Sequence, residues 1–346
     1  MLVVAVSHVF LAFSQENAQS AAEQNAKPAR VSGGVFSLWP VTKTYPSAEE
    51  LDLPCTAGLS ARLGWAFLEP KPGEYQWKAL DAARDLAVGA KKQLMVRVTA
   101  GMNSPLWIYD RGCRKITFSG GDTNFLKPGS MHTMPVPWDE AYLAAWEQFL
   151  QALGQHLRNW DNLSCLYCVQ MTGGGLIGEM YLPKDSKEVI AQWRAAGISD
   201  EKLIAMWQRI IQTYDRAIPQ GIGLVLDLGQ PFNRSKATPA IFAWALKKYP
   251  GRVWFQQNGL SERTKADSQY AQMLSQASRT TTVGYQMLGG GDFLDQKTGD
   301  RRKAFDRAIA DGCKYVEVYR QDLNDPKWRS AVEYLADGLR KNAKGN

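Results

Sequence analysis

The chain has 346 residues, of which 45% are hydrophobic, enough for the core of one large domain or two small ones. Its formal net charge is +7, but Lys and Arg are scattered among acidic residues along the whole chain, so the composition does not indicate a nucleic-acid-binding protein. Only three histidines are present, which argues against an imidazole-based metal site, and nothing implies a cofactor.

The first 22 residues resemble a secretory signal peptide. The apolar segment MLVVAVSHVFLAF is followed by small and polar residues, although the usual basic residues before it are missing. It is too short for a comfortable membrane span, and no later stretch approaches one. We expect residues 1–22 to be a signal peptide, 23–32 a polar leader and 33–346 the folded domain of a secreted or periplasmic protein.

Eight apolar segments after residue 32 have the length and turn signals of buried strands. In chain order they are GGVFSLWP (33–40), GLSARLGWAFLEP (58–70), KQLMVRVTAG (92–101), LSCLYCVQM (163–171), IGLVLDLGQPF (222–232), RVWFQQNGL (252–260), TTVGYQML (281–288) and KYVEVYRQDL (314–323).

Amphipathic helices are expected between these strands. The clearest are 140–157, which Asp139 can cap, and 201–218, which begins at Ser199 or Asp200. Strands alternating with helices at intervals of roughly 30 to 40 residues predict a (β/α)8 TIM barrel in one domain. An open doubly wound sheet is the rival, but it would more often carry a GxGxxG turn, which is absent.

The fourth strand carries the strongest sign of function. It ends in three glycines, Gly173–Gly175, and a single carboxylate, Glu179, follows in an otherwise uncharged loop. Barrel enzymes deliver catalytic groups to the C-terminal rim of the sheet in this way. The sequence therefore predicts Glu179 as a catalytic residue; the alternative is that it caps a helix or pairs with an arginine.

Other side chains are expected on the same rim because they lie at or after the strand ends. Amides and tryptophans around one opening suit a polyhydroxylated ligand, since flat indole faces pack on sugar rings. Two arginines of this set either bind an acidic sugar group or neutralise barrel carboxylates, and we favour the second. The expected substrate-binding residues are Trp39, Arg62, Trp65, Arg97, Trp107, Gln170, Gln257, Asn258, Gln286 and Tyr319.

Three stretches resemble a known family. GLSARLGWAFLEPKPGEYQWKALDAARDLA is similar to the "R…W…LEP…G.YDW..LD…A" segment of retaining barrel glycosidases, notably family 42 β-galactosidases. SPLWIYDRG and PVPWDEAYLAAWEQFL resemble their "P.W" loop and the helix before strand four. GGGLIGEM resembles the "G..GE" ending of uncharacterised glycosidase-like barrel families. The resemblance covers about residues 34–183, implies a clan-A-like glycoside hydrolase, and assigns the acid/base role to Glu179.

The second carboxylate of a glycosidase is harder to assign. The resemblance implies a glutamate nucleophile at the end of strand seven, where this chain has Gln286, and an amide cannot form a glycosyl ester. Glu317 is the first substitute and Asp227 the second, although Glu317 could instead form an interior ion pair with Arg62 or Arg97. Two hypotheses therefore remain: a glycoside hydrolase, and a non-hydrolytic carbohydrate-binding protein on a degenerate barrel.

Overall fold

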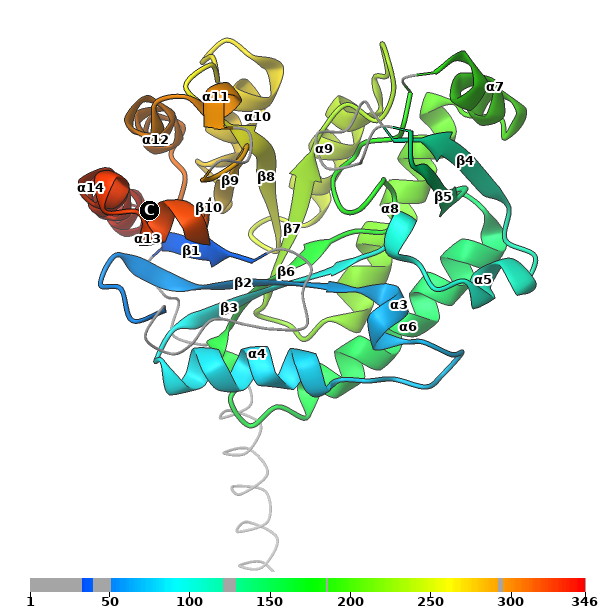
Figure 1. The fold of residues 1–346 in the computed structure, drawn as a ribbon, viewed down its shortest axis with the longest axis horizontal. Coiled ribbons are helices and arrows are strands. Elements are labelled where there is room, and N and C mark those ends of the chain that lie inside the picture. Colours follow the sequence, from blue (N-terminus) through cyan, green and yellow to red (C-terminus); the bar gives the residue numbers. More distant parts are fainter. Residues whose placement is uncertain (1–32, 40–50, 121–128, 185, 292–294, 346) are drawn as a thin grey trace, which may run out of the picture. The chain divides into compact units, whose positions relative to one another are not determined.

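Eight parallel strands close into a barrel in the computed structural model, which describes residues 33–39, 51–120, 129–184, 186–291 and 295–345 (Figure 1). The predicted single-domain (β/α)8 TIM barrel is confirmed, with all eight predicted strands in the cylinder. The predicted signal peptide and leader lie outside the described residues. Around the barrel the strands are β1 (Gly34–Leu38), β2 (Thr56–Gly64), β3 (Gln93–Thr99), β6 (Leu166–Met171), β7 (Gly223–Leu228), β8 (Val253–Leu260), β9 (Val283–Met287) and β10 (Tyr315–Tyr319).

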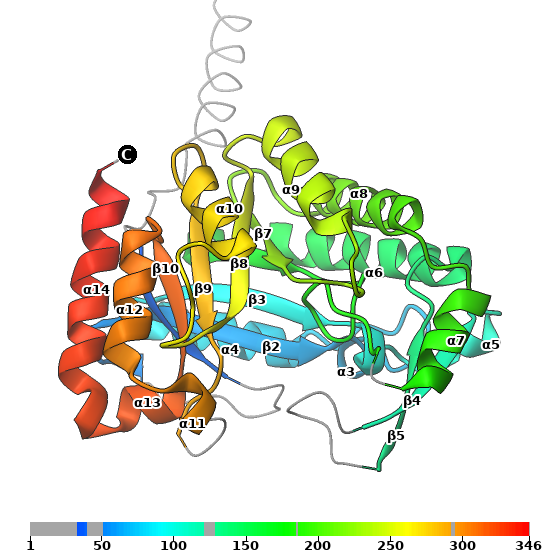
Figure 2. The same ribbon diagram turned by 90° about the horizontal axis from the view of Figure 1, so that it is seen from above.

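Helices cover the outside of the barrel (Figure 2). Asp139 caps α6 (Glu140–Arg158) by accepting hydrogen bonds from the amides of Ala141 and Tyr142, and Ser199, not Asp200, caps α8 (Asp200–Ala217). The longer helices are α4 (Lys78–Gly89), α6 (Glu140–Arg158), α7 (Lys187–Ala195), α8 (Asp200–Ala217), α9 (Ala237–Lys248), α10 (Gln269–Ala277), α12 (Arg301–Ala310) and α14 (Arg329–Lys344). The short ones are α3 (Trp65–Leu68), α5 (Trp107–Asp110), α11 (Asp295–Thr298) and α13 (Arg320–Asn324).

Two predicted segments differ in detail. The second strand ends at Gly64, where its pairing with β3 stops, and Trp65–Leu68 turn into α3, closed by a hydrogen bond from the Glu69 amide to the Trp65 carbonyl oxygen. The long loop after β3 contains an antiparallel hairpin of β4 (Lys115–Ser119) and β5 (Met131–Pro135). The sequence predicted an unusual loop here but not its strands.

The N-terminal end of the barrel interior is filled by a small apolar cluster, which is separate from the main core between strands and helices. Glycines on neighbouring strands make room for its aromatic rings: a Cβ at Gly284 would collide with the Tyr315 ring, and one at Gly223 with the Trp254 ring. The N-terminal end of the barrel is therefore packed with side chains. The cluster consists of Phe36, Met95, Cys168, Val225 and Tyr315, with Ala57, Tyr167 and Trp254 packed against it.

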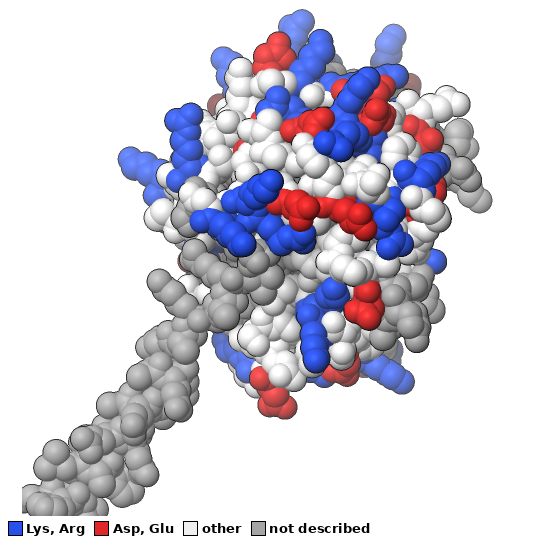
Figure 3. Space-filling view, turned by 90° about the vertical axis from the view of Figure 1, so that its left-hand side faces the viewer, with Lys and Arg blue, Asp and Glu red and all other residues white. Residues whose placement is uncertain are grey.

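Charged residues are mixed on the surface. On the face in Figure 3, Lys and Arg side chains lie beside Asp and Glu, as expected for a solvated surface and as the scattered sequence charges predicted. Within the described ranges, no helix combines the length and apolar character needed to cross a membrane.

Candidate active site

A set of polar side chains lies inside the barrel, and most of them stand two residues along their strand from a member of the apolar cluster. Side chains of a strand alternate between its two faces, so positions two apart share the barrel interior. All members of this interior polar cluster are 7% exposed or less. They are Ser60, Arg97, Gln170, Asp227, Gln256, Gln286 and Glu317.

Arg97 is the centre of this interior polar cluster. Its Nη2 atom lies 2.8 Å from Asp227 Oδ2 and 3.7 Å from Glu317 Oε2, and its Nε atom donates to the Gln170 side-chain oxygen. Burial acts to lower the pKa of Arg97, but the two carboxylates outweigh it and raise that pKa. The cation that neutralises the interior carboxylates is thus a side chain. The part of the chain that the structure describes contains no cluster of His, Cys, Asp and Glu suited to a metal ion.

Glu317 is fully buried, and both of its carboxylate oxygens have hydrogen-bond partners. Its Oε1 atom accepts a hydrogen bond from the Ser60 hydroxyl, and its Oε2 atom accepts one of 2.6 Å from Gln256 Nε2. With Arg97 close to the same Oε2 atom, both oxygens have protein partners. This arrangement corresponds to the interior ion pair that the sequence offered as the alternative to a catalytic Glu317.

Asp227 is also fully buried but less well partnered. It faces Arg97, and neither of its oxygens has a hydrogen bond that meets the usual geometry within the described chain. Burial raises the pKa of Asp227 to about 7; Arg97 opposes this rise, while the charges of Glu317 and Glu179 add to it. Asp227 is therefore a carboxyl group that changes its charge near neutral pH.

This pKa makes stability depend on pH. In the unfolded chain an aspartate ionises near pH 4, about three units lower than in the folded barrel, so the folded state holds the Asp227 proton more tightly. Raising the pH from about 4 to about 7 therefore lowers the free energy of unfolding. We expect the melting temperature of the wild type, measured relative to Asp227→Asn, to fall across this range and level off above it. A constant difference between the two proteins would contradict a folded pKa near 7.

Glu179 lies at the mouth of the barrel, the opening at the C-terminal ends of the strands. Its side chain is half-buried, and Asn258 Nδ2 donates to its Oε2 atom over 3.4 Å. Gln256 Nε2 donates in turn to Asn258 Oδ1 over 2.8 Å and also to Glu317. A continuous path of hydrogen bonds thus connects the carboxylate at the mouth with the carboxylate in the interior.

The loop that carries Glu179 is fixed by backbone contacts. Gly101, after β3, has a φ of +61°, and a Cβ there would collide with the Leu176 carbonyl oxygen. The same oxygen accepts a 2.9 Å hydrogen bond from the Met102 amide. The loop also closes on itself, because the Tyr181 amide donates to the Glu179 carbonyl oxygen over 2.7 Å. The position of Glu179 is therefore set by the ends of β3 and β6 together.

Several of the predicted rim residues do meet at the mouth. Arg62 is half-buried and donates through Nη2 to the Gln286 side-chain oxygen, which Arg97 Nη1 approaches to 3.5 Å. Burial raises the pKa of Tyr319, a half-buried residue that also feels the charges of Arg62 and Glu179. The structure therefore brings Arg62, Gln286 and Tyr319 together around one opening.

The predicted tryptophans do not present open faces at this mouth. Trp65 is fully buried, donates to Glu69 Oε2 over 2.7 Å and packs edge-on against Trp107. Trp107 is half-buried and donates to the Glu69 carbonyl oxygen. Trp39 is 4% exposed, with the Arg320 guanidinium 4.2 Å from its ring centroid. The geometry gives these three rings packing partners within the protein.

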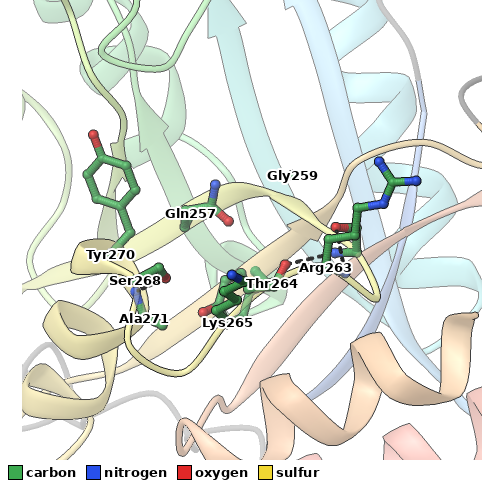
Figure 4. A pocket seen from close by; sticks show the side chains of 10 residues that line it. Gln257, Gly259, Arg263, Thr264, Lys265, Ser268, Tyr270 and Ala271 are labelled. Atoms are coloured by element: carbon green, nitrogen blue, oxygen red, sulfur yellow. Dashed lines mark hydrogen bonds between the residues drawn. The ribbon is translucent and has the colours of Figure 1, made fainter. Parts of the chain in front are cut away.

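Gln257, which the sequence predicted on the barrel rim, faces away from the interior. Its neighbour Gln256 points into the barrel instead. Gln257 lines a hollow of about 330 Å³ between the end of β8 and the start of α10, together with Lys265, Ser268 and Tyr270 (Figure 4). The alternation along β8 explains the difference. Phe255 packs outward against the ring of Phe242 in α9, so Gln256 must point inward.

Comparisons with known proteins support the fold. No protein-family model matches the sequence, and no curated protein matches it. Among solved structures, the barrel is similar to the catalytic domain of a β-amylase from Paenibacillus polymyxa (TM-score 0.59, 9% identity, 89% of this chain and 97% of that chain covered). It is also similar to a family 10 endo-β-1,4-xylanase from Gloeophyllum trabeum (0.51, 10%, 91% and 98%). A third match is a β-galactosidase from Marinomonas ef1 (0.52, 10%, 90% and 59%). These neighbours are glycoside hydrolases, and at such identities the likeness shows a shared barrel fold.

Proposed function

We propose that the protein is a glycoside hydrolase in which Glu179 donates a proton to the leaving oxygen. The observation that carries this proposal is the half-buried Glu179 carboxylate at the barrel mouth, contacted by Asn258. A carboxylic acid at this rim can protonate a glycosidic oxygen. The resemblance of residues 34–183 to family 42 β-galactosidases and their relatives, and the similar barrels of known glycoside hydrolases, support the same function.

Asp227 is the better candidate for the second carboxylate. Both oxygens of Glu317 already accept hydrogen bonds, whereas within the described ranges Asp227 has its contact with Arg97 and no hydrogen bond. A pKa of about 7 also suits a general base near neutral pH. Because Gln286 at the end of β9 cannot act as a nucleophile, we assign Asp227 to activating a water molecule, with inversion at the anomeric carbon.

A second candidate function is carbohydrate binding without cleavage. The full burial of Asp227 and Glu317, together with the amide at Gln286, favours it, because none of these side chains exposes a carboxylate at the mouth. In that case Glu179, Asn258 and Tyr319 would hold a sugar through hydrogen bonds. The binding face would be the same mouth, and the two functions differ only in whether a bond is broken.

A screen of aryl glycosides and of plant and bacterial polysaccharides tests the proposal. The signal-like segment at residues 1–22 supports export, so extracellular polysaccharides are the first to try. We expect one class to be cleaved, with the inverted anomer appearing first by NMR, and Asp227→Asn to lose more activity than Glu317→Gln. Release of the retained anomer would contradict Asp227 as the base, and binding without cleavage throughout would identify the second function.

A further inference from the structure

Arg62 is a cation at the mouth whose protein partner is neutral. Its Nη2 atom donates to the Gln286 amide oxygen, and its Nε atom is buried without a hydrogen bond to the described residues. No carboxylate oxygen of the described chain lies within 4.0 Å of its nitrogens. Surface arginines tolerate such a situation because water surrounds them, but Arg62 is half-buried.

The carboxylates deeper in the barrel do not form an ion pair with Arg62. Asp227 and Glu317 lie 2.8 Å and 3.7 Å from Arg97, and neither comes within ion-pair distance of the Arg62 guanidinium. Burial and the neighbouring Arg97 lower the pKa of Arg62, while Glu317, Tyr319 and Glu179 act in the opposite direction from beyond ion-pair distance. Two guanidinium groups thus share the region of one amide oxygen, and among the described residues no carboxylate pairs with the outer one, Arg62.

Gln286 is the reason for this imbalance. A carboxylate at that position would form an ion pair with Arg62, whereas the amide offers only a hydrogen-bond acceptor. The guanidinium has five N–H donors in a planar fork, and the structure gives a protein partner to just one donor group of Arg62 among the described residues. Neutral sugar hydroxyls could accept hydrogen bonds from the remaining donors but could not balance the charge.

We propose that Arg62 binds an anionic group of the carbohydrate, either the carboxylate of a uronic acid or a sulfate ester. This inference rests on the proposed function in taking the ligand to be a carbohydrate at this mouth. Both groups present oxygens that match the guanidinium fork. Glu179 faces the same opening, and its proposed role as proton donor directs it to the glycosidic oxygen, which leaves the anionic group to Arg62. The net charge of +7 further favours encounter with acidic polysaccharides.

The test compares three oligosaccharides of one backbone: one with uronic acids, its carboxyl-reduced neutral form, and a sulfated derivative of the neutral form. The readout is Kd by titration calorimetry where the sugar is only bound, and kcat/KM where it is cleaved. We expect the wild type to prefer an acidic form by about tenfold or more. The preference should disappear in Arg62→Gln and persist in Arg263→Gln, a matched control on an exposed loop residue beside β8. Comparing the uronate-containing and the sulfated oligosaccharide then shows which of the two anions Arg62 binds.

Equal values for acidic and neutral forms in the wild type would overturn the inference, as would an acid preference that survives in Arg62→Gln. Cleavage of neutral sugars without charge preference would do so while leaving the proposed hydrolase intact. Arg62-dependent binding of acidic sugars without any cleavage would support the inference and contradict hydrolysis instead. If Arg62→Gln fails to fold, Arg62→Lys serves: it keeps the charge, so it should keep an acid preference that falls as salt is raised.

Discussion

Replacing Glu179 with Gln is expected to reduce glycoside cleavage by about 10² to 10⁴-fold, the usual contribution of a positioned general acid. The amide has nearly the same shape, but at neutral pH it has no acidic proton to donate to the leaving oxygen. Stability should change little, because the side chain is half-buried and its hydrogen bond with Asn258 is a long one of 3.4 Å. Rates on an aryl glycoside and melting temperatures measured side by side check both expectations.

Glu74→Gln is the matched control for this substitution. Glu74 is an exposed carboxylate whose ion-pair partner is the exposed Lys71, so its loss should leave turnover unchanged. An aryl glycoside with a very good leaving group should also suffer less from Glu179→Gln than one with a poor leaving group, since it needs less protonation. Undiminished cleavage of the poor leaving group by Glu179→Gln would remove Glu179 from the proton-donor role.

Replacing Arg97 with Met is expected to lower the free energy of unfolding by about 3–5 kcal/mol. Asp227 and Glu317 are both fully buried, and the substitution would leave them without their cation inside the barrel. Denaturant unfolding monitored by circular dichroism measures the change. Arg263→Gln, which removes an exposed charge, should stay within about 0.5 kcal/mol of the wild type.

A double-mutant cycle makes the Arg97 prediction sharper. In a background with Asp227→Asn and Glu317→Gln, the cost of Arg97→Met should shrink, because no buried negative charge remains to be left unpaired. If Arg97→Met costs less than about 1 kcal/mol in the wild type, or costs the same in both backgrounds, the three side chains are not energetically coupled.

The fold could be predicted because buried parallel strands have a clear sequence signature. Each strand is covered by helices outside and by side chains inside, so it appears as a nearly continuous apolar run bounded by turns. The helices between them were equally clear where a capping residue such as Asp139 preceded an apolar period. Hairpin β4–β5 was missed because its strands are short and only partly buried, which leaves a weak pattern.

The site was harder to predict because a strand buried on both faces does not show which face is inward. This is why Gln257 was chosen in place of Gln256. The missing signal is the alternation of an apolar neighbour. Phe255 is the residue of β8 that packs outward, so Gln256 points inward and Gln257 outward again.

Depth within the barrel was the other missing quantity. The sequence indicated that Asp227, Glu317 and Glu179 all come from strand ends, but not that the first two lie one layer below the opening. Depth depends on the stagger between neighbouring strands, such as the pairing of Asp227 with Gln256, and single-chain patterns do not reveal it. A similar limit applies to Trp65, which follows the end of β2 at Gly64 but packs its indole against Trp146 and Phe149 of α6.

The aromatic packing around Tyr315 and Trp254, which Gly284 and Gly223 accommodate, closes the barrel interior at its N-terminal end. Under the proposed function, a substrate enters and its products leave through the same opening at the C-terminal strand ends. A departing product therefore competes there with the next substrate. Proton exchange between Asp227 and the solvent takes place through this opening as well. The side chains at the mouth therefore control how fast it occurs.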